Sequence, residues 1–379
     1  MKILLLVTGV GYGDSTREEA NINELMKQDP KTRIVVAGYD NSYRYFRGKL
    51  PVIKIKGYRL PGTKLKFNVL PFIFYNYLLP FIWVFFALKI RRAVKAFKPD
   101  VIISDFEPTG IALAKLVKKK CIVIFGYDPE LYKEYASKHR LSWKTRVEAW
   151  YFEQIYKKAD HVIIPSFFPE RISNKLSKGE GIEEQKFSRV HVTVRKGPRD
   201  LQPKNVLMKK LGLKKQPIIV MMGGSEFGYS LAKKIRKLTG TFDEEFIAFG
   251  GRKKLRSAKN FRHYRFKENF LEYLKVSKGV ITLAGQKTLA ECAIFKKPML
   301  IFPIKHHVEQ EINAYSLRRY AMTGSAENLK GKNLKNLVGL FIARLPDLKS
   351  KIEQAKIVDG GSKEIAAIVR TLLRQRTKH

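Results

Sequence analysis

The stretch 279-GVITLAGQKTLAECAIFKKPMLIFPIKHHVEQ-310 decides the fold of this chain. It begins with an apolar strand pattern that ends at Leu283, and Ala284-Gly285 supplies a turn. A helix pattern covers residues 286–295, and a second apolar strand covers residues 299–302. Such a unit places a helix N-terminus, which carries a partial positive charge, beyond the carboxyl end of a buried parallel strand. The stretch therefore predicts an open α/β sheet with a crevice for a phosphorylated ligand.

The same alternation of short apolar strands and helices extends along the whole chain. With 379 residues and 45% apolar residues, the chain is longer than one compact core serves and can bury two. A segment broken by glycine and proline ends near residue 203, where we place the domain boundary. We expect two Rossmann-like, doubly wound α/β domains facing across a cleft, residues 1–203 and 204–360, followed by a helix within residues 361–379.

The composition is strongly basic, with 74 Lys and Arg against 34 Asp and Glu and a formal net charge of +40. This excess indicates a polyanionic partner, either nucleic acid or an anionic membrane surface. A lysine-rich solvated surface of the kind found in heat-adapted proteins is the alternative, although a balanced Lys and Glu surface would suit it better. Cys121 and Cys292 lie in or beside apolar runs, which indicates reduced, buried thiols and a cytoplasmic chain.

Residues 69–88, VLPFIFYNYLLPFIWVFFAL, are almost entirely apolar, and four basic residues follow by position 95. As one helix, twenty residues would span about 30 Å, enough to cross a bilayer. A crossing would separate the strands before this stretch from the strand at residues 101–104, and Pro80 interrupts the helical ladder. We therefore expect a membrane-associating segment, residues 69–97, made of two helical pieces whose aromatic face lies in the membrane interface. A helix buried against the sheet and a true membrane span are the alternatives. The expected aromatic face consists of Phe72, Phe74, Tyr75, Phe81, Trp83, Phe85 and Phe86.

Carboxylates follow two strands of the first domain. The first strand runs into a loop with Gly11 and Gly13, which lets the backbone approach a ligand, and Asp14 can cap the helix that follows. Asp105 and Glu107 come directly after the strand at residues 101–104, in the ligand zone of an open sheet. For either residue, capping a helix or pairing with a lysine is the structural alternative.

The second domain contains two places that can hold phosphate groups. Backbone N–H groups of Gly223, Gly224 and Ser225, together with the helix that starts near Gly285, can hold a diphosphate without a metal ion. Glu291 in that helix can accept hydrogen bonds from two vicinal ribose hydroxyls. An ion-paired helix glutamate is the alternative for Glu291.

Four segments of this half resemble nucleotide-sugar glycosyltransferases of the two-Rossmann GT-B type. They are GGSEFG at 223–228, the run from Phe266 to Glu291, KKPMLIFP at 296–303 and EQEINA at 309–314. Within that type the chain resembles the peptidoglycan transferase MurG, the monogalactosyldiacylglycerol synthases and their archaeal counterparts, and the resemblance covers nearly the whole chain.

The resemblance implies a UDP-type sugar donor bound to the second domain and an acceptor bound to the first. It also implies that the last helix packs back on the first domain, and that neither a cofactor nor a metal ion is needed. The implied donor contacts are the diphosphate at Gly223, Gly224, Ser225, Gly285, Gln286, Lys287 and Thr288, the ribose at Glu291, the sugar at Glu309 and Gln310, and the uracil near Phe266.

The chain departs from these relatives at one position. They usually carry a histidine after the first glycine loop, where this chain has Asp14. A general base must take the proton of the acceptor hydroxyl as the new bond to C1 of the sugar forms. Asp14 can serve as this base in an inverting displacement if its surroundings raise its pKa, and Asp105 and Glu107 are the reserve candidates.

Taken together, the sequence predicts a glycosyltransferase of the hexosyltransferase kind, peripheral on the cytoplasmic face of a membrane. It would move a sugar from a nucleotide-diphosphate sugar to a lipid-linked or membrane-embedded acceptor. Its partners would be the sugar nucleotide, the lipid acceptor and an anionic membrane surface, without nucleic acid. A nucleic-acid-binding protein on an inactive transferase scaffold and a sugar-nucleotide epimerase are the alternatives.

Overall fold

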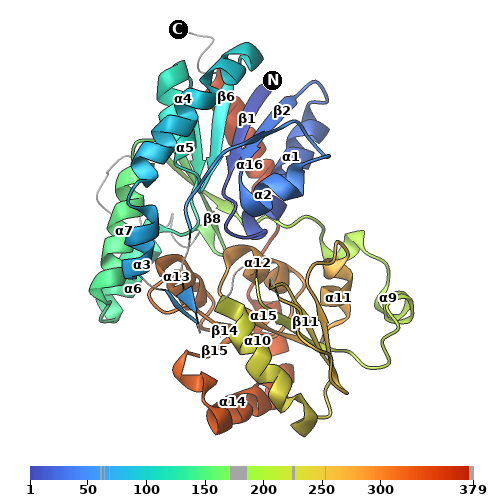
Figure 1. The fold of residues 1–379 in the computed structure, drawn as a ribbon. Helices are drawn as coiled ribbons and strands as arrows, with labels where there is room; N and C mark the ends of the chain where they lie inside the picture. The colour runs from blue at the N-terminus through green and yellow to red at the C-terminus, as the bar shows by residue number, and fades with distance from the viewer. Residues whose placement is uncertain are drawn as a thin grey trace. The chain divides into compact units, whose positions relative to one another are not determined.

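The computed structural model describes residues 1–59, 62–63, 65–67, 69–170, 186–223, 227–251 and 253–374. The chain forms two compact units, and each is built around its own parallel sheet (Figure 1). Unit 1 contains Met1–Leu60, Val69–Arg195 and Val358–His379, whereas unit 2 contains Pro61–Asn68 and Lys196–Ile357. The units divide between Arg195 and Lys196, a few residues before the boundary expected at residue 203.

Unit 1 contains a seven-stranded sheet in the order β3-β2-β1-β6-β7-β8-β9, with every neighbouring pair parallel. The chain moves outward from β1 to β3 and then returns to the other side of β1, so the strand order reverses between β1 and β6. In open α/β sheets, ligands bind beyond the carboxyl ends of the strands at such a switch point. The strands are β1 (Lys2–Val7), β2 (Arg33–Gly38), β3 (Val52–Lys54), β6 (Val101–Asp105), β7 (Cys121–Ile124), β8 (His161–Ser166) and β9 (Phe187–His191).

Helices cover both faces of this sheet, which explains why its central strands are continuous apolar runs (Figure 1). Helices α4 and α5 pack against each other over one face, and α1, α2 and α16 cover the other. The helices of unit 1 are α1 (Gly13–Gln28), α2 (Asp40–Phe46), α3 (Val69–Asn76), α4 (Leu79–Phe97), α5 (Thr109–Val117), α6 (Pro129–Lys138), α7 (Trp143–Tyr156) and α16 (Gly361–Arg374).

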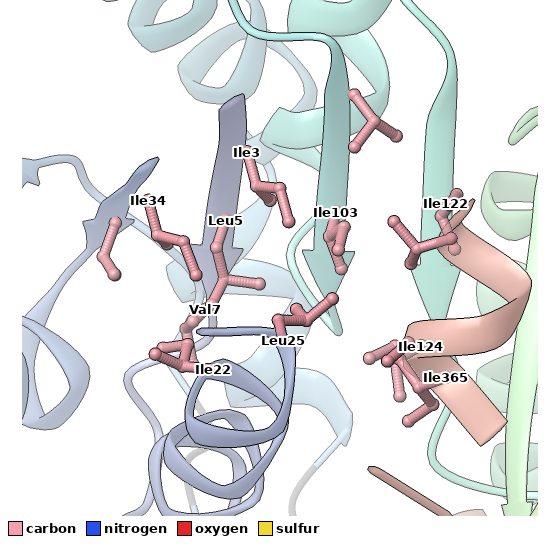
Figure 2. Packing of buried hydrophobic residues seen from close by; sticks show 14 of the residues in the cluster. Ile3, Leu5, Val7, Ile22, Leu25, Ile34, Ile103, Ile122, Ile124 and Ile365 are labelled. Atoms are coloured by element: carbon pink, nitrogen blue, oxygen red, sulfur yellow. The ribbon is translucent and has the colours of Figure 1, made fainter. Parts of the chain in front are cut away.

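The last helix supplies part of the core of unit 1. Figure 2 shows Ile3, Leu5 and Val7 of β1 in one packed group with α1 and α16. From α16, Ile365 is buried in this group. The side chain of Glu364 also binds β9, accepting a hydrogen bond from the backbone N–H of His191 at 2.7 Å. Helix α16 is therefore an integral part of unit 1 although it lies at the far end of the chain.

The apolar segment at residues 69–97 forms two helical pieces, α3 and α4, as expected. The break falls at Tyr77 and Leu78, and Pro80 lies in the first turn of α4, where a missing backbone N–H removes no helical hydrogen bond. Trp83 is 7% exposed, so it faces the protein interior and not the aromatic surface on which the sequence places it. By length and apolar composition, Leu70–Phe97 could cross a membrane. However, β1 before this segment pairs directly with β6 after it, which keeps both of its ends on one side.

Unit 2 contains a six-stranded sheet in the order β12-β11-β10-β13-β14-β15, again entirely parallel. Its strand order reverses between β10 and β13, so the second switch point lies where these two strands end. The strands are β10 (Ile218–Met221), β11 (Phe246–Phe249), β12 (Phe261–Tyr264), β13 (Gly279–Leu283), β14 (Met299–Phe302) and β15 (Met322–Thr323). The helices are α9 (Lys204–Lys210), α10 (Phe227–Leu238), α11 (Phe270–Val276), α12 (Gln286–Ile294), α13 (Val308–Ser316), α14 (Gly331–Ala343) and α15 (Leu345–Gln354).

A short hairpin from the first half of the sequence also belongs to unit 2. It consists of β4 (Gly62–Thr63) and β5 (Lys66–Phe67), which pair in antiparallel fashion. Leu65 between them is fully buried, and its carbonyl accepts a hydrogen bond from the backbone N–H of Lys305 at 2.9 Å. The expectation that residues 1–203 form a single domain is therefore wrong for this segment.

Candidate active site

The switch point of unit 1 begins with the loop after β1. A side chain at Gly9 would overlap the carbonyl oxygen of Tyr39, so only glycine fits there. Gly11 lies in the same loop, and Gly13 begins α1. A side chain added at Gly11 would meet only the backbone nitrogen of Gly13, at 3.9 Å, so the space beside Gly11 is open. Packing therefore requires a glycine at position 9, and the sequence prediction did not identify this requirement.

Asp14, in the first turn of α1, is held by an arginine one turn later. The Nη2 of Arg17 donates to Oδ1 of Asp14 at 2.7 Å and to Oδ1 of Asp105 at 2.5 Å. The Nε of Arg17 donates to Oδ2 of Asp105 at 3.1 Å. The structure therefore brings the predicted Asp14 and Asp105 together through one guanidinium group.

The three side chains differ in their access to solvent. Asp105 is fully buried and Arg17 nearly so, whereas the side chain of Asp14 is 28% exposed. Burial raises the pKa of Asp14 to about 6, with Arg17 lowering it and Asp105 raising it. Burial beside Asp105 also raises the pKa of Glu18 well above its ordinary range. Asp14 is the carboxylate of this group that a ligand can reach.

Glu107 follows β6 in a buried position. Its Oε1 accepts hydrogen bonds from the hydroxyl of Thr109 at 2.6 Å and the backbone N–H of Thr109 at 3.3 Å, so it caps the start of α5. Its Oε2 is buried and has no hydrogen-bond partner among the described residues. Burial raises the pKa of Glu107 to about 7. The capping role that the sequence left open for this residue is present, together with one unpaired oxygen.

An aromatic cluster surrounds this end of the sheet. The ring of Phe106 lies 5.6 Å from that of Tyr156, and Phe125 lies 4.7 Å from the same ring. Burial raises the pKa of Tyr156 far above its ordinary value, and the negative charge of Glu107 adds to that shift. The Tyr156 hydroxyl has no hydrogen-bond partner in the part of the chain that the structure describes. Because these side chains come from the residues just after β6 and β7 and from α7, nothing in their sequence spacing indicates that they meet.

The glycine loops of unit 2 lie at its own switch point. Gly223 follows β10 with a φ of +67°, a conformation that glycine adopts without strain. Gly251, after β11, donates its backbone N–H to the Gly223 carbonyl at 3.1 Å, so the two loops are joined. The predicted Gly224 and Ser225 lie outside the described residues.

The N-terminus of α12 is open. Gly285 precedes this helix, and a side chain there would meet no atom within 4 Å. Behind it, Gln286, Lys287 and Glu291 are buried, and Thr288 is half-buried. Lys287 Nζ lies 3.9 Å from Oε1 of Glu291. The ion-paired alternative for Glu291 is thus present in the structure, beside the open helix N-terminus that the sequence predicts.

The remaining predicted donor residues differ in their roles. Gln310 Oε1 accepts backbone N–H groups from Ala284 and Ile304, each at 3.2 Å, and so joins the loops after β13 and β14. Glu309 is half-buried in the first turn of α13. Phe266, shortly after β12, is 48% exposed. Gln310 therefore shapes the loops, while Glu309 and Phe266 remain accessible.

A comparison with known families decides what these two sites belong to. The sequence pattern of glycosyl transferase family 1 matches residues 1–178 and 219–346, which include both switch points. The chain belongs to this glycosyltransferase family.

Relatives and solved structures agree with this assignment. An uncharacterized glycosyltransferase of Methanosarcina mazei is 25% identical over 334 residues, 83% of this chain and 82% of that protein. One from Methanopyrus kandleri is 24% identical over 292 residues, 73% of this chain and 76% of that protein. The structure of this chain also matches that of the spinosyn forosaminyltransferase SpnP, with a TM-score of 0.61 and 13% identity over 99% of both chains. Acinetobacter baumannii MurG matches with a TM-score of 0.59 and 14% identity, over 98% of this chain and 99% of that one. The two parallel-sheet units are those of the GT-B fold.

Within the described residues of the glycosyltransferase, no group of three or more His, Cys, Asp or Glu side chains is arranged to hold a metal ion. The sequence prediction also missed Arg17, whose spacing from Asp14 is the i, i+3 spacing of an ion pair on a helix. That spacing could have identified Arg17, whereas no local signal indicates its second partner, Asp105.

Proposed function

We propose that this glycosyltransferase moves a sugar from a nucleotide-diphosphate sugar, with UDP as the nucleotide, to a lipid-linked or membrane-embedded acceptor. The enzyme would act at the cytoplasmic face of a membrane, with inversion at C1 and without a metal ion. The resemblance to MurG and the monogalactosyldiacylglycerol synthases supports this part of the proposal. The observation that carries the chemical part is Asp14, a partly exposed carboxylate with a raised pKa at the switch point of unit 1.

The chemistry requires one base and one leaving-group site. The acceptor oxygen forms a bond to C1 of the sugar while the bond from C1 to the phosphate oxygen breaks. The proton of the acceptor hydroxyl passes to Asp14, and the nucleoside diphosphate leaves with the electron pair. A single displacement of this kind inverts the configuration at C1. Because its pKa is about 6, Asp14 is ionised at neutral pH yet is a stronger base than an ordinary aspartate.

The donor assignment rests on unit 2. The open N-terminus of α12 offers backbone N–H groups and a helix dipole to the diphosphate, and Gly223 lets the neighbouring loop approach it. Charge that develops on the leaving diphosphate would be stabilised there. Glu291 in the same helix would accept hydrogen bonds from the ribose hydroxyls, with Lys287 holding its carboxylate.

The acceptor assignment rests on the surface of α3 and α4. Lys89, Arg92 and Lys95 follow the apolar part of α4, in a chain with a formal charge of +40, which favours anionic lipid headgroups. An exposed apolar patch beside basic residues is typical of a protein that lies on a membrane. The large exposed apolar side chains are Leu70, Phe74, Tyr75, Tyr77, Leu78, Phe81, Val84, Phe85 and Leu88.

A thermal-shift screen of UDP-, GDP- and dTDP-sugars tests the donor class. A rise in melting temperature with UDP-sugars alone supports the proposal, whereas a response to GDP- or dTDP-sugars alone contradicts the nucleotide assignment. Incubation with the selected donor then separates transfer to added lipid extract from epimerisation of the sugar nucleotide, which needs no acceptor.

Glu291→Ala tests the ribose contact. We expect the affinity for UDP, measured by calorimetry, to fall about tenfold or more, because a charge-assisted hydrogen bond contributes roughly 1.5–3 kcal/mol. Glu245→Ala, which removes a partly exposed ion pair with Arg262 in the same unit, is the matched control and should bind UDP as the wild type does. Equal affinities for both variants would exclude Glu291 as a ribose ligand.

A further inference from the structure

We propose that Arg17 and Asp105 form a carboxylate clamp that holds Asp14 in the orientation needed to accept a proton. In this arrangement Asp14 is the catalytic residue, and Arg17 and Asp105 are positioning residues. The inference rests on the proposed role of Asp14 as the base.

The hydrogen bonds of Arg17 fix the plane of its guanidinium group. Nε and Nη2 donate to the two oxygens of Asp105, at 3.1 and 2.5 Å, in the two-point geometry that suits arginine and a carboxylate. Nη2 also donates to Oδ1 of Asp14, at 2.7 Å. Because β6 sets the position of Asp105 and Asp105 sets the plane of Arg17, the orientation of Asp14 is tied to the central sheet.

Exposure divides the roles within the clamp. Asp105 is fully buried, and the Arg17 side chain is 5% exposed, so neither can meet the acceptor hydroxyl. The 28% exposed side chain of Asp14 can do so. Arg17 donates to Oδ1 of Asp14 and so occupies that oxygen. The clamp therefore leaves Oδ2 of Asp14 as the oxygen that receives the proton.

The charges around Asp14 favour proton uptake. The positive charge of Arg17 is matched by Asp105, and burial beside Asp105 raises the pKa of Glu18 well above its ordinary value, which favours the neutral form of Glu18. Ionised Asp14 shares Arg17 with Asp105, so accepting a proton removes a negative charge that Arg17 balances only in part. The titratable groups around Asp14 also include Glu107, whose charge acts on Tyr39 and Tyr156, and tyrosines whose pKa values are raised by burial: Tyr39, Tyr58 and Tyr156.

Three variants separate charge from geometry. Arg17→Gln removes the positive charge, and Asp105→Asn removes the negative charge with little change of shape. Arg17→Lys keeps the charge, but one ammonium group cannot reproduce the flat two-point contact with Asp105. Arg189→Gln is the matched control, since Arg189 on the edge strand β9 also makes a partly buried contact with a carboxylate of unit 1, 2.6 Å from Asp128.

The first measurement is the pKa of Asp14 itself, followed in the full chain without substrate by NMR of ¹³C-carboxyl aspartate and assigned with Asp14→Asn. We expect a value near 6 in the wild type, a higher value in Arg17→Gln and a lower value in Asp105→Asn. Arg17→Lys and Arg189→Gln should stay close to the wild type. If the value is the same in Arg17→Gln, Asp105→Asn and the wild type, the clamp is wrong; Asp105→Asn alone decides this point if Arg17→Gln does not fold.

The second measurement is the pH profile of transfer with the UDP-sugar selected by thermal shift and a lipid extract as acceptor. The acidic limb of kcat should move in the same directions as the pKa of Asp14. Arg17→Lys should keep the limb and lower kcat about tenfold or more, with the donor KM unchanged, because the base is misoriented. A full rate in Arg17→Lys would overturn the geometric part of the clamp. If the pKa of Asp14 changes in the variants but the acidic limb of kcat does not, the clamp is supported and Asp14 is not the base.

Discussion

Two carboxylates at the switch point of unit 1 differ in what they can do. Asp14 is partly exposed and held from one side, whereas Glu107 is fully buried and caps α5. A group that exchanges a proton with an acceptor must be reachable by it. Asp14 meets this condition, while Glu107 can influence the reaction only through its charge.

Asp14→Asn should abolish most of the transfer activity. We expect kcat to fall by about 10²–10⁴, the usual contribution of a general base, because the amide cannot take the proton. Since Asp14 belongs to unit 1 and the proposed donor contacts to unit 2, calorimetry should give an unchanged affinity for UDP. In the wild type, the rate should rise with pH through about 6 as Asp14 loses its proton. Normal transfer by Asp14→Asn would exclude this residue as the base.

Glu107→Gln should change how stability depends on pH. The pKa of Glu107 is raised from 4.5 to about 7, so the folded state holds this proton more tightly than the unfolded chain. Its contribution to stability is complete below pH 4.5 and is lost as pH rises through 7, by on the order of 3 kcal/mol. The glutamine variant stays neutral. In urea unfolding, its free energy of unfolding should therefore rise relative to that of the wild type between pH 4.5 and pH 8.

An exposed glutamate provides the comparison for that measurement. Glu353 pairs with Lys349 on the surface of α15, so Glu353→Gln should leave stability nearly unchanged across this pH range. If Glu107→Gln behaves like Glu353→Gln, the buried oxygen of Glu107 is not where the pH dependence arises.

At the scale of elements, α4 presents two faces with different roles. One face is buried within unit 1 and consists of Leu79, Trp83, Ala87, Ile90 and Val94. The opposite side exposes apolar residues that include Phe81 and Phe85. One helix therefore serves both the core and the proposed membrane surface.

The double variant Phe81→Ser with Phe85→Ser should weaken membrane binding. Each phenylalanine buries apolar area worth roughly 1.5–3 kcal/mol when it enters the lipid interface, so flotation with vesicles of mixed neutral and anionic lipids should fall about tenfold or more. Leu340→Ser, at a half-exposed position of α14 in unit 2, is the control and should float as the wild type does. Unchanged flotation of the double variant would remove α4 from the membrane surface.

Sequence patterns predict most elements of both sheets, because parallel strands buried on two faces are continuous apolar runs bounded by loops. The unit from β13 to β14 is confirmed almost to the residue. Strand β9 was missed because only Phe187 and Val190 of its five residues are apolar and they do not follow a strand spacing, at the edge of the sheet and beside a lysine-rich segment. Trp83 was assigned to the wrong face because the first half of α4 is apolar on nearly all sides, so its sequence does not indicate which side is buried.

For the candidate site, the sequence predicts several of the residues but not the contacts between them. Asp14, Asp105 and Glu107 were found because polar residues at strand ends gather at one edge of a sheet. The contact between Asp14 and Asp105 was not predictable, because it passes through Arg17 and depends on the pairing of β1 with β6. Tyr156 of α7 lies in the same region, and its position in the sequence does not predict its contact with Phe106.

At the scale of the whole molecule, each unit has its own sheet and its own switch point, yet the chain passes between the units more than once. Residues of the first half supply the buried Leu65 to unit 2, and the last helix supplies Ile365 to unit 1. The stability of unit 1 therefore depends on residues that follow all of unit 2 in the sequence.

Ile365→Ala should destabilise unit 1 selectively. Truncating a fully buried isoleucine costs roughly 2–5 kcal/mol, so the unfolding of unit 1 should occur at lower urea, as reported by hydrogen exchange in β1 and β6. Exchange in β10 and β13 of unit 2 should change much less. Ile368→Ala, at a partly buried position of the same helix, is the milder control, and equal effects of the two variants would contradict the core role of Ile365.

The late position of α16 has a consequence for synthesis on the ribosome. The sheet face formed by Ile3, Leu5 and Ile103 is covered in part by a helix that emerges only after Lys196–Ile357 has been translated. At about 5–20 residues per second, that interval lasts roughly 8–30 s. Throughout it, the nascent chain exposes both this unfinished sheet face and the apolar side of α4, so chaperones or the membrane itself have time to bind unit 1 before its fold is complete.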